Sequence, residues 1–417
     1  MSNKLPQNWL ECKLGEIFET SSGGTPKRGM AKYYQNGTIP WLKSGELNNS
    51  VICNAEEYIT KGGLNNSSAK IFPKGSLLIA LYGATVGKLG ILDFDSATNQ
   101  AICCIYQNNN YNRDFLFYYL LFRKEYLVNQ GKGGAQPNIS QEIIKSLIIP
   151  FPPLNEQKRI VEKIESEFAK IDEGLEHLEQ AKEQIKQYRQ SVLKSAFEGK
   201  LYKTSEWKET TLGEVVEPRR ERITPNDKNG NMVFIGMDCI EPNSLYIHKQ
   251  YKLKETKSVA FVFYKNDVIY GRMRSYLNKV WEATCNGTAS AEFIVFPEND
   301  KIFSSYLKYL LHQQNFVKYA TRNASGDRPR VKFESDLADY KFRLPSIEKQ
   351  KKIVVEIEKR LAVADEVEKL VEQNIEKAKQ LKQSILKKAF EGRLVPQEPN
   401  DEPASTLLDK IKQERSK

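Results

Sequence analysis

The sequence lacks the features that mark several common classes of protein. It has no run of about 18 apolar residues, which a membrane-spanning helix requires, and its first residues lack the apolar core of a secretory signal. The six cysteines form no C-x-x-C pair and the three histidines are scattered, so nothing indicates a metal site or a disulfide framework. We therefore expect a cytoplasmic protein with buried thiols and with no metal or cofactor of its own.

Positive charge, by contrast, is in excess and unevenly placed. The net charge is +10 over 417 residues, a length that predicts two or three domains. Residues 1–150 and 204–344 each carry +4, whereas 151–203 is neutral and 345–417 carries +2. Basic globular segments on a neutral frame favour binding of a polyanion, although charge alone also fits a mildly basic surface without a partner.

The strongest feature of the sequence is an internal duplication. Residues 152–201 and 345–394 align without a gap at an offset of 193, and about half of the aligned positions are identical. In both copies apolar residues recur at spacings of three and four among Glu, Lys and Gln, which predicts a long amphipathic helix. Proline precedes each helix, and Gly199 and Gly392 stand where a left-handed cap would end it.

The two long helices are predicted to pair in antiparallel orientation. A helix of about 45 residues is roughly 65 Å long, and its narrow apolar seam stays exposed unless a partner covers it. The segment between the helices has an expected radius of gyration of only about 15 Å, too small to carry the chain back to the start of a parallel partner. An antiparallel pair with one globular domain at each end is therefore expected.

The globular segments repeat more faintly. Each opens with a tryptophan, Trp9 or Trp207, followed five residues later by Leu-Gly-Glu. Strand-like runs, an aromatic-rich helical stretch and a glycine-bearing loop (131–140 or 324–332) then follow in the same order. The predicted fold class is mixed α/β (α+β): two globular domains joined by two long helices in an antiparallel coiled coil, with an internal pseudo-twofold repeat.

Several of these segments resemble the specificity subunits of type I restriction–modification systems. The most specific signature is the junction IPFPPLNEQKRIVEKI (149–164), whose counterpart LPSIEKQKKIV (344–354) has one proline fewer. The resemblance covers nearly the whole chain and weakens only after Leu394. In the first globular segment it is carried by GGTPKRGMAKYY (23–34), IPWLKSGEL (39–47), YGATVGK (82–88) and TNQAI (98–102).

This resemblance implies a domain organisation. Residues 1–150 and 204–344 are expected to be two target-recognition domains, and 151–203 and 345–395 the two long helices. Residues 396–417, rich in Pro, Asp, Glu and Lys, are expected to be a flexible C-terminal tail.

The resemblance also implies a function. Each target-recognition domain reads one half of an asymmetric, bipartite site in double-stranded DNA. The helices act as a ruler and dock two methyltransferase (modification) subunits and two restriction/translocase subunits. The chain itself is then a non-catalytic DNA-recognition subunit, with S-adenosylmethionine, ATP and Mg expected in the partner subunits and no membrane involved.

Candidate DNA contacts lie in loops that match or replace the family's motifs. Arginine suits guanine and Asn or Gln suits adenine, whereas Lys, Ser and Thr suit phosphate. The second domain lacks GGTPK and GATVGK and has nine arginines against three in the first. Arg328 and Arg330 occupy the loop corresponding to Gln136 and Asn138, which predicts guanine readout where the first domain reads adenine. The candidates are Thr25, Lys27, Arg28, Lys43, Ser44, Lys88, Gln136 and Asn138 in the first domain, and Arg219, Arg220, Arg272, Arg274, Arg328 and Arg330 in the second.

Two other interpretations compete with DNA reading. A coiled-coil protein-interaction scaffold without DNA specificity explains the long helices equally well, but not the arginine-rich loops. A self-sufficient enzyme is disfavoured because the sequence shows no motif for binding a cofactor. The stretch YGATVGKLG is one residue short of a phosphate-binding loop and has Leu89 in place of the magnesium-binding hydroxyl.

Overall fold

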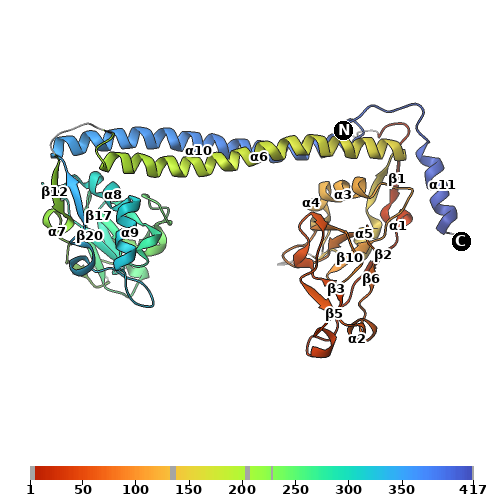
Figure 1. The fold of residues 1–417 in the computed structure, drawn as a ribbon, viewed down its shortest axis with the longest axis horizontal. Helices are drawn as coiled ribbons and strands as arrows, with labels where there is room; N and C mark the ends of the chain where they lie inside the picture. The colour runs from red at the N-terminus through yellow and green to blue at the C-terminus, as the bar shows by residue number, and fades with distance from the viewer. Residues whose placement is uncertain (1–4, 132–137, 202–206, 227–228, 416–417) are drawn as a thin grey trace. The chain divides into compact units, whose positions relative to one another are not determined.

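The computed structural model describes residues 5–131, 138–201, 207–226 and 229–415 (Figure 1). The chain forms two compact units. Unit 1 comprises residues 1–176 with 375–417, and unit 2 comprises residues 177–374. Each unit contains one globular domain and one part of each long helix, and no helix in the described ranges is long and apolar enough to cross a membrane.

The two long helices lie in the duplicated segments and keep the offset of the duplication. Helix α6 (Leu154–Phe197) and helix α10 (Ile347–Phe390) each contain 44 residues, and both ends are offset by 193. Gly199 and Gly392 have φ of +75° and +66°, the left-handed conformation in which glycine ends a helix without steric strain. The observed helices lie within the predicted segments 151–203 and 345–395 and keep the predicted offset.

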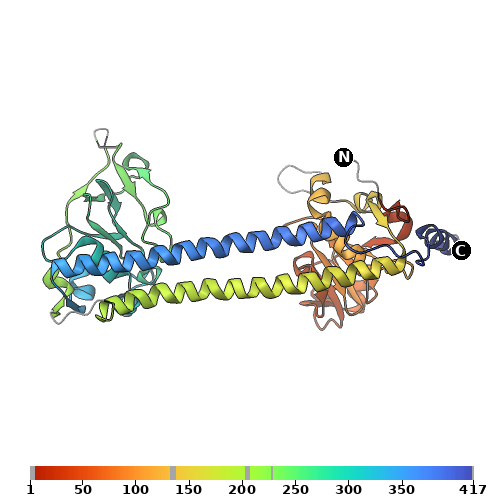
Figure 2. The same cartoon turned by 90° about the horizontal axis from the view of Figure 1, so that it is seen from above.

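Ion pairs show that the helices are antiparallel (Figure 2). In unit 1, Lys382 on α10 pairs with Asp172 on α6 at 2.5 Å. In unit 2, Arg189 on α6 pairs with Glu368 on α10 at 2.6 Å. Residue numbers fall along one helix as they rise along the other, which confirms the predicted orientation.

Each globular domain packs on the end of the helix that the other repeat supplies. The ring centroid of Phe390, at the end of α10, lies 5.3 Å from that of Phe115 and 5.0 Å from that of Tyr119, both in unit 1. Phe197, at the end of α6, lies 5.1 Å from Tyr306 of unit 2 in the same way. The repeated Ala-Phe-Glu-Gly sequence is therefore a docking point for a globular domain.

The globular domain of unit 1 contains two mixed sheets. The five-stranded sheet has the order β2-β10-β7-β8-β4 and the four-stranded sheet the order β5-β3-β9-β6, and short strands β1 and β11 pair beside the long helices. The strands are β1 (Leu10–Lys13), β2 (Thr20–Ser22), β3 (Ile39–Leu42), β4 (Ser50–Ile52), β5 (Glu57–Ile59), β6 (Ile71–Phe72), β7 (Leu77–Ala80), β8 (Leu89–Leu92), β9 (Ser96–Thr98), β10 (Ile102–Ile105) and β11 (Ile148–Phe151). The helices are α1 (Leu14–Ile17), α2 (Lys61–Asn65), α3 (Arg113–Phe122), α4 (Lys124–Gln130) and α5 (Gln141–Ser146).

The globular domain of unit 2 repeats this plan with altered sheets. A five-stranded sheet has the order β13-β16-β19-β14-β15, a three-stranded sheet has the order β18-β17-β20, and β12 pairs with β21. The strands are β12 (Lys208–Thr211), β13 (Arg222–Ile223), β14 (Val233–Ile235), β15 (Tyr251–Lys252), β16 (Ala260–Phe263), β17 (Val268–Gly271), β18 (Val280–Glu282), β19 (Gly287–Ser290), β20 (Phe293–Phe296) and β21 (Lys341–Leu344). The helices are α7 (Leu212–Val215), α8 (Ser304–His312) and α9 (Gln314–Asn323).

The strand register shows that the two globular domains are true repeats. In unit 1, Ala80 of β7 pairs with Ile102 of β10. In unit 2, Gly271 of β17 pairs with Phe293 of β20. Both residues of the pair are offset by 191 and both ladders are antiparallel, so the fold class with its internal repeat is confirmed.

The C-terminal segment differs from the flexible tail that its composition predicts. Residues Ala404–Arg415 form helix α11, and its residues Leu407 and Ile411 are 3% and 0% exposed in the core of unit 1. Asp401, just before the helix, pairs with Arg159 of α6 at 2.6 Å. The prediction used the average polarity of this segment and missed its apolar residues, which recur at helical spacing. These residues pack α11 onto unit 1.

Candidate nucleic-acid interface

The family-like motifs of unit 1 meet at one end of its five-stranded sheet. The backbone N–H of Gly24 donates to Thr98 O at 2.9 Å, and that of Leu81 donates to Ala101 O at 2.7 Å. A Cβ on Gly23 would lie 2.2 Å from Thr98 O, so only glycine allows this close approach. The segments 23–34, 82–88 and 98–102 are thus brought together.

Arg28 is held in a defined position within this cluster. Its guanidinium lies 4.7 Å from the Trp41 ring centroid and 4.9 Å from that of Tyr34, and its Nη1 is 2.6 Å from Glu57. Lys43 also pairs with Glu57, at 2.9 Å. Hydrogen bonds from Arg28 and Lys43 hold the pKa of Glu57 below its ordinary value, so the carboxylate stays charged between two cations.

The other candidates of unit 1 lie on the loops around this end of the sheet. Lys27 is exposed, Ser44 and Lys88 are half-buried, and the Thr25 hydroxyl donates to Gln100. Asn138 is exposed, and Gln136 lies outside the described residues. The loops that carry the described candidates meet, although no side-chain contact joins them all.

In unit 2, four of the predicted arginines lie on two loops in direct contact. The backbone N–H of Arg274 donates to Pro329 O at 2.7 Å, and that of Val331 donates to Arg272 O at 3.0 Å. Arg274 is exposed with a φ of +53°, and Arg328 is exposed at the tip of the neighbouring loop. This contact places Arg272, Arg274, Arg328 and Arg330 in one basic cluster.

The same backbone contacts relate Arg330 to Asn138. The N–H of Ile139 donates to Leu81 O at 2.7 Å, just as the N–H of Val331 donates to Arg272 O. Asn138 and Arg330 each precede the donating residue. They are therefore equivalent positions of the repeat, which is the correspondence that the sequence predicts.

Arg330 makes a bidentate ion pair that the sequence did not predict. Its Nε and Nη2 lie 2.8 and 2.7 Å from the two carboxylate oxygens of Glu292. Hydrogen bonding from Arg330, together with the charges of Arg272 and Arg328, lowers the pKa of Glu292. The partners are 38 residues apart and no local pattern joins them, so only the fold identifies this pair.

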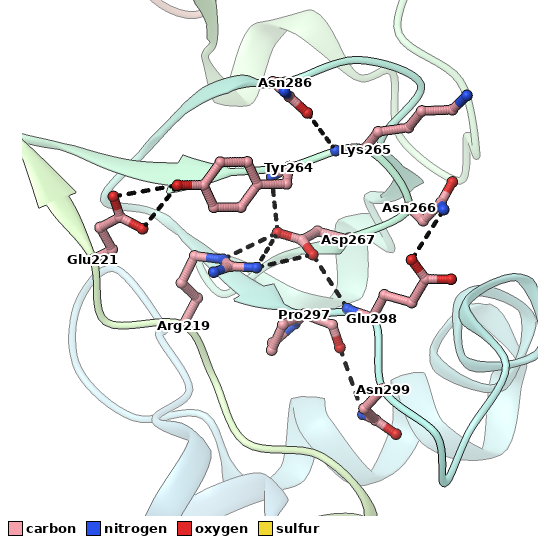
Figure 3. Close-up of polar contacts among 10 residues, drawn as sticks. All are labelled: Arg219, Glu221, Tyr264, Lys265, Asn266, Asp267, Asn286, Pro297, Glu298 and Asn299. Atoms are coloured by element: carbon pink, nitrogen blue, oxygen red, sulfur yellow. Dashed lines mark hydrogen bonds and ion pairs between the residues drawn. The ribbon is translucent and has the colours of Figure 1, made fainter.

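Arg219 differs from the cluster because its partner is buried. Its side chain binds Asp267, which is 2% exposed and also accepts hydrogen bonds from the backbone of Tyr264 and Glu298 (Figure 3). The guanidinium also lies 4.6 Å from the Tyr264 ring centroid. Such an arginine neutralises a buried acid, so we leave Arg219 out of the interface that we propose.

A cavity of about 290 Å³ adjoins the basic cluster. Arg220 lines the cavity and makes an exposed ion pair with Glu334 at 3.0 Å. The other cationic residues that line this cavity are Arg219, Arg222, Arg272 and Lys332. A concave surface with this many cations suits a phosphate backbone.

Within the described ranges, no cluster of three or more His, Cys, Asp or Glu could hold a metal ion. Burial raises the pKa of Cys103 and of Cys104 to about 12, so these thiols stay protonated. Cys53 is exposed, unlike the buried thiol that we expected.

Comparison with known proteins identifies the family. A model of the type I restriction modification DNA specificity domain matches residues 6–187 and again residues 204–377. The chain belongs to this family. Membership gives it a role in DNA recognition, and the two matches correspond to the two halves of the repeat.

Curated relatives and solved structures agree with this assignment. The specificity subunit of the type I restriction enzyme EcoDI from Escherichia coli is 25% identical over 457 aligned positions, covering 100% of this chain and 97% of the relative. The EcoBI specificity subunit from the same species is 28% identical, covering 76% and 75%. A chain from a structure on complex assembly and conformational transition of the type I R-M system matches with a TM-score of 0.72 and 20% identity, covering 94% of this chain and 99% of that one. The HsdS subunit from Thermoanaerobacter tengcongensis has a TM-score of 0.56 and 20% identity, covering 94% and 98%. These two structures are similar to this chain in fold.

Proposed function

We propose that this chain is the non-catalytic DNA-reading subunit of a type I restriction–modification complex and recognises a bipartite, asymmetric site in double-stranded DNA. Each globular domain reads one half of that site. The observation that carries the proposal is the pair of equivalent positions Asn138 and Arg330, which carry side chains suited to different bases in the same structural frame.

The candidate contacts divide by their surroundings into base readers and phosphate contacts. Asn138 and Arg330 have the forked groups that base edges require. Exposed Lys27, and Arg220 at the cationic cavity, are proposed phosphate contacts that do not read sequence, and exposed Arg328 remains a candidate guanine reader on the loop of Arg330. Thr25, Arg28, Lys43, Ser44, Lys88, Arg272 and Arg274 are the other described residues of the proposed interface.

The long helices are the proposed dock for two modification subunits, with two restriction/translocase subunits completing the complex. Helix α10 exposes Val363, Val367 and Leu370, which are 55%, 42% and 52% exposed and recur at helical spacing. An exposed apolar stripe on a charged helix favours a partner helix. Similarity in fold to a chain from a structure on complex assembly of the type I R-M system supports assembly with partner subunits. The S-adenosylmethionine, ATP and Mg that methylation and cleavage require belong, in this proposal, to those partners.

The test is an exchange of one globular domain. Residues 1–150 are replaced by the matching domain of a relative, and the variant is assembled with its modification partners. Mapping of methylated adenines should show one half-site changed and the other intact. A simultaneous change in both half-sites would contradict separate reading.

A second measurement separates DNA reading from the scaffold interpretation. Binding of the purified chain to duplex DNA is measured at several salt concentrations. A reader of DNA weakens steeply as salt rises, because phosphate contacts release counterions. Absence of binding at low salt would favour a scaffold.

A further inference from the structure

Glu292 occupies a fixed place beside the proposed base reader. It lies between β19 and β20, and its backbone O accepts a hydrogen bond from the N–H of Arg272 at 2.9 Å. Its side chain is 27% exposed and that of Arg330 is 40% exposed. The ion pair therefore lies at the surface of the basic cluster.

The geometry of the pair leaves one edge of the guanidinium free. Glu292 takes Nε and Nη2, whereas Nη1 makes no hydrogen bond to any residue that the structure describes. Arginine has five N–H groups in a planar fork, so Nη1 and the second N–H of Nη2 still form a two-donor edge. Guanine offers O6 and N7 as paired acceptors, which such an edge fits.

The internal repeat provides an independent comparison. Glu292 of unit 2 is equivalent to Ala101 of unit 1, because each backbone O accepts from the residue that follows the paired strand, Arg272 or Leu81. The arginine at position 330 thus has a carboxylate neighbour, whereas its equivalent Asn138 has a methyl group in that place. Arginine has more rotatable bonds than asparagine, so a carboxylate neighbour can restrict its side chain to one orientation.

A purely structural ion pair looks different in this same domain. Asp267, the partner of Arg219, is 2% exposed and has its oxygens occupied by two backbone N–H groups as well. The carboxylate of Glu292 accepts no backbone hydrogen bond from the described part of the chain. Its side chain instead pairs with that of Arg330.

We propose that Glu292 is a positioning residue that presents the free edge of Arg330 to a guanine in the second half-site. This inference rests on the proposed function and adds to it the base class read and the residue that orients the reader. Fixing the side chain before binding removes part of the entropy cost of ordering an arginine on DNA. Guanine preference should therefore depend on both residues.

The experiment selects binding sites for the full-length chain from duplexes with randomised half-sites. The variants are Arg330→Ala, Glu292→Gln and the double variant. Asp327→Asn is the matched control, because it removes one negative charge, as Glu292→Gln does, from the loop that carries Arg330, and Asp327 contacts Arg330 in no described hydrogen bond or ion pair. Wild type should prefer guanine about tenfold at one position.

Arg330→Ala should abolish this preference, and Glu292→Gln should reduce it at least about threefold at that position alone. The double variant should match Arg330→Ala, since Glu292 acts only through Arg330. Asp327→Asn should tighten binding to all sequences equally, because it removes repulsion of phosphates. Preferences at the other positions of the second half-site report that unit 2 remains folded.

Each other outcome overturns a defined part of the argument. If wild type shows no base preference anywhere, the proposed function fails and this inference fails with it. If wild type reads both half-sites but Arg330→Ala or Glu292→Gln leaves every position unchanged, the inference fails and the function stands. If Glu292→Gln weakens all positions of the second half-site together, Glu292 supports the fold and does not position Arg330.

Discussion

At the residue scale, two arginines of unit 2 make the same fork-to-carboxylate contact in different surroundings. Arg219 binds an acid that is 2% exposed, whereas Arg330 binds one that is 27% exposed. Removing one member of a buried pair strands the other charge away from water, which costs far more than losing a surface pair.

We therefore expect Arg219→Ala to lower the free energy of unfolding by about 2–4 kcal/mol, and Arg330→Ala to lower it by less than about 1 kcal/mol. Arg330→Ala should instead relax base preference in the second half-site. Urea unfolding of both variants and wild type measures the first effect. Equal losses of stability would contradict the separate roles.

We expect His312 to make the stability of unit 2 depend on pH. Burial, followed by the charge of Lys308, lowers the pKa of His312 to about 4. In the unfolded chain the pKa of His312 is the ordinary value of about 6.5. The stability contributed by a neutral His312 is therefore complete above about pH 6.5 and is lost as the pH falls toward 4. The expected loss is about 2 kcal/mol, because the residue keeps some contact with solvent.

Urea unfolding of wild type and His312→Gln at pH 7 and pH 5 measures this loss. The variant should lose less stability between the two pH values than wild type. His177→Gln, a change at an exposed position of α6, is the matched control and should follow wild type. Parallel curves for all three proteins would exclude His312 as the source.

At the scale of elements, helix α11 is an integral part of unit 1. Ile411 is 0% exposed, and truncation of such a residue leaves a cavity. Ile411→Ala should lower the free energy of unfolding by about 2–4 kcal/mol, whereas Asp409→Ala, at an exposed position of the same helix, should change it by less than about 0.5 kcal/mol. Thermal unfolding of the two variants decides this, and an unchanged Ile411→Ala would mean that α11 does not pack in solution.

The exposed stripe of α10 makes a different prediction. Val367→Glu combined with Leu370→Glu should prevent assembly with the modification subunit and leave DNA binding intact, because the stripe is apolar and belongs to no described core cluster. Copurification and DNA binding measure the two properties. Ala362→Glu, at an exposed position of the same helix, is the control and should assemble normally.

At the scale of the whole molecule, periodic features were predictable and contacts between distant segments were not. The offset of 193 predicted that α6 and α10 correspond residue by residue, and the loop order predicted the equivalence of Asn138 and Arg330. The pairs of Arg219 with Asp267 and of Arg330 with Glu292 join residues 48 and 38 positions apart. Such separations leave no periodic trace in a single sequence, so the division of the arginines into internal and exposed groups required the fold.

The proposed ruler can be tested through the continuity of the helices. Seven residues of helical sequence are inserted into α6 after Glu176 and into α10 after Asn374, so that the seam keeps its face in both helices. Each insertion adds about 10 Å of helix, which equals about three base pairs of duplex. The methylation pattern of the assembled variant should show unchanged half-sites with a gap about three base pairs longer, and an unchanged gap with full activity would contradict the ruler.

The duplication of the long helices also has an evolutionary consequence. Each globular domain docks on the same Ala-Phe-Glu-Gly segment, once at Phe197 and once at Phe390. Genetic exchange within the repeated segments can therefore join a globular domain from one gene to the remainder of another without disturbing either core. We therefore expect the duplicated helix to serve as a junction at which a single crossover creates a new pairing of globular domains.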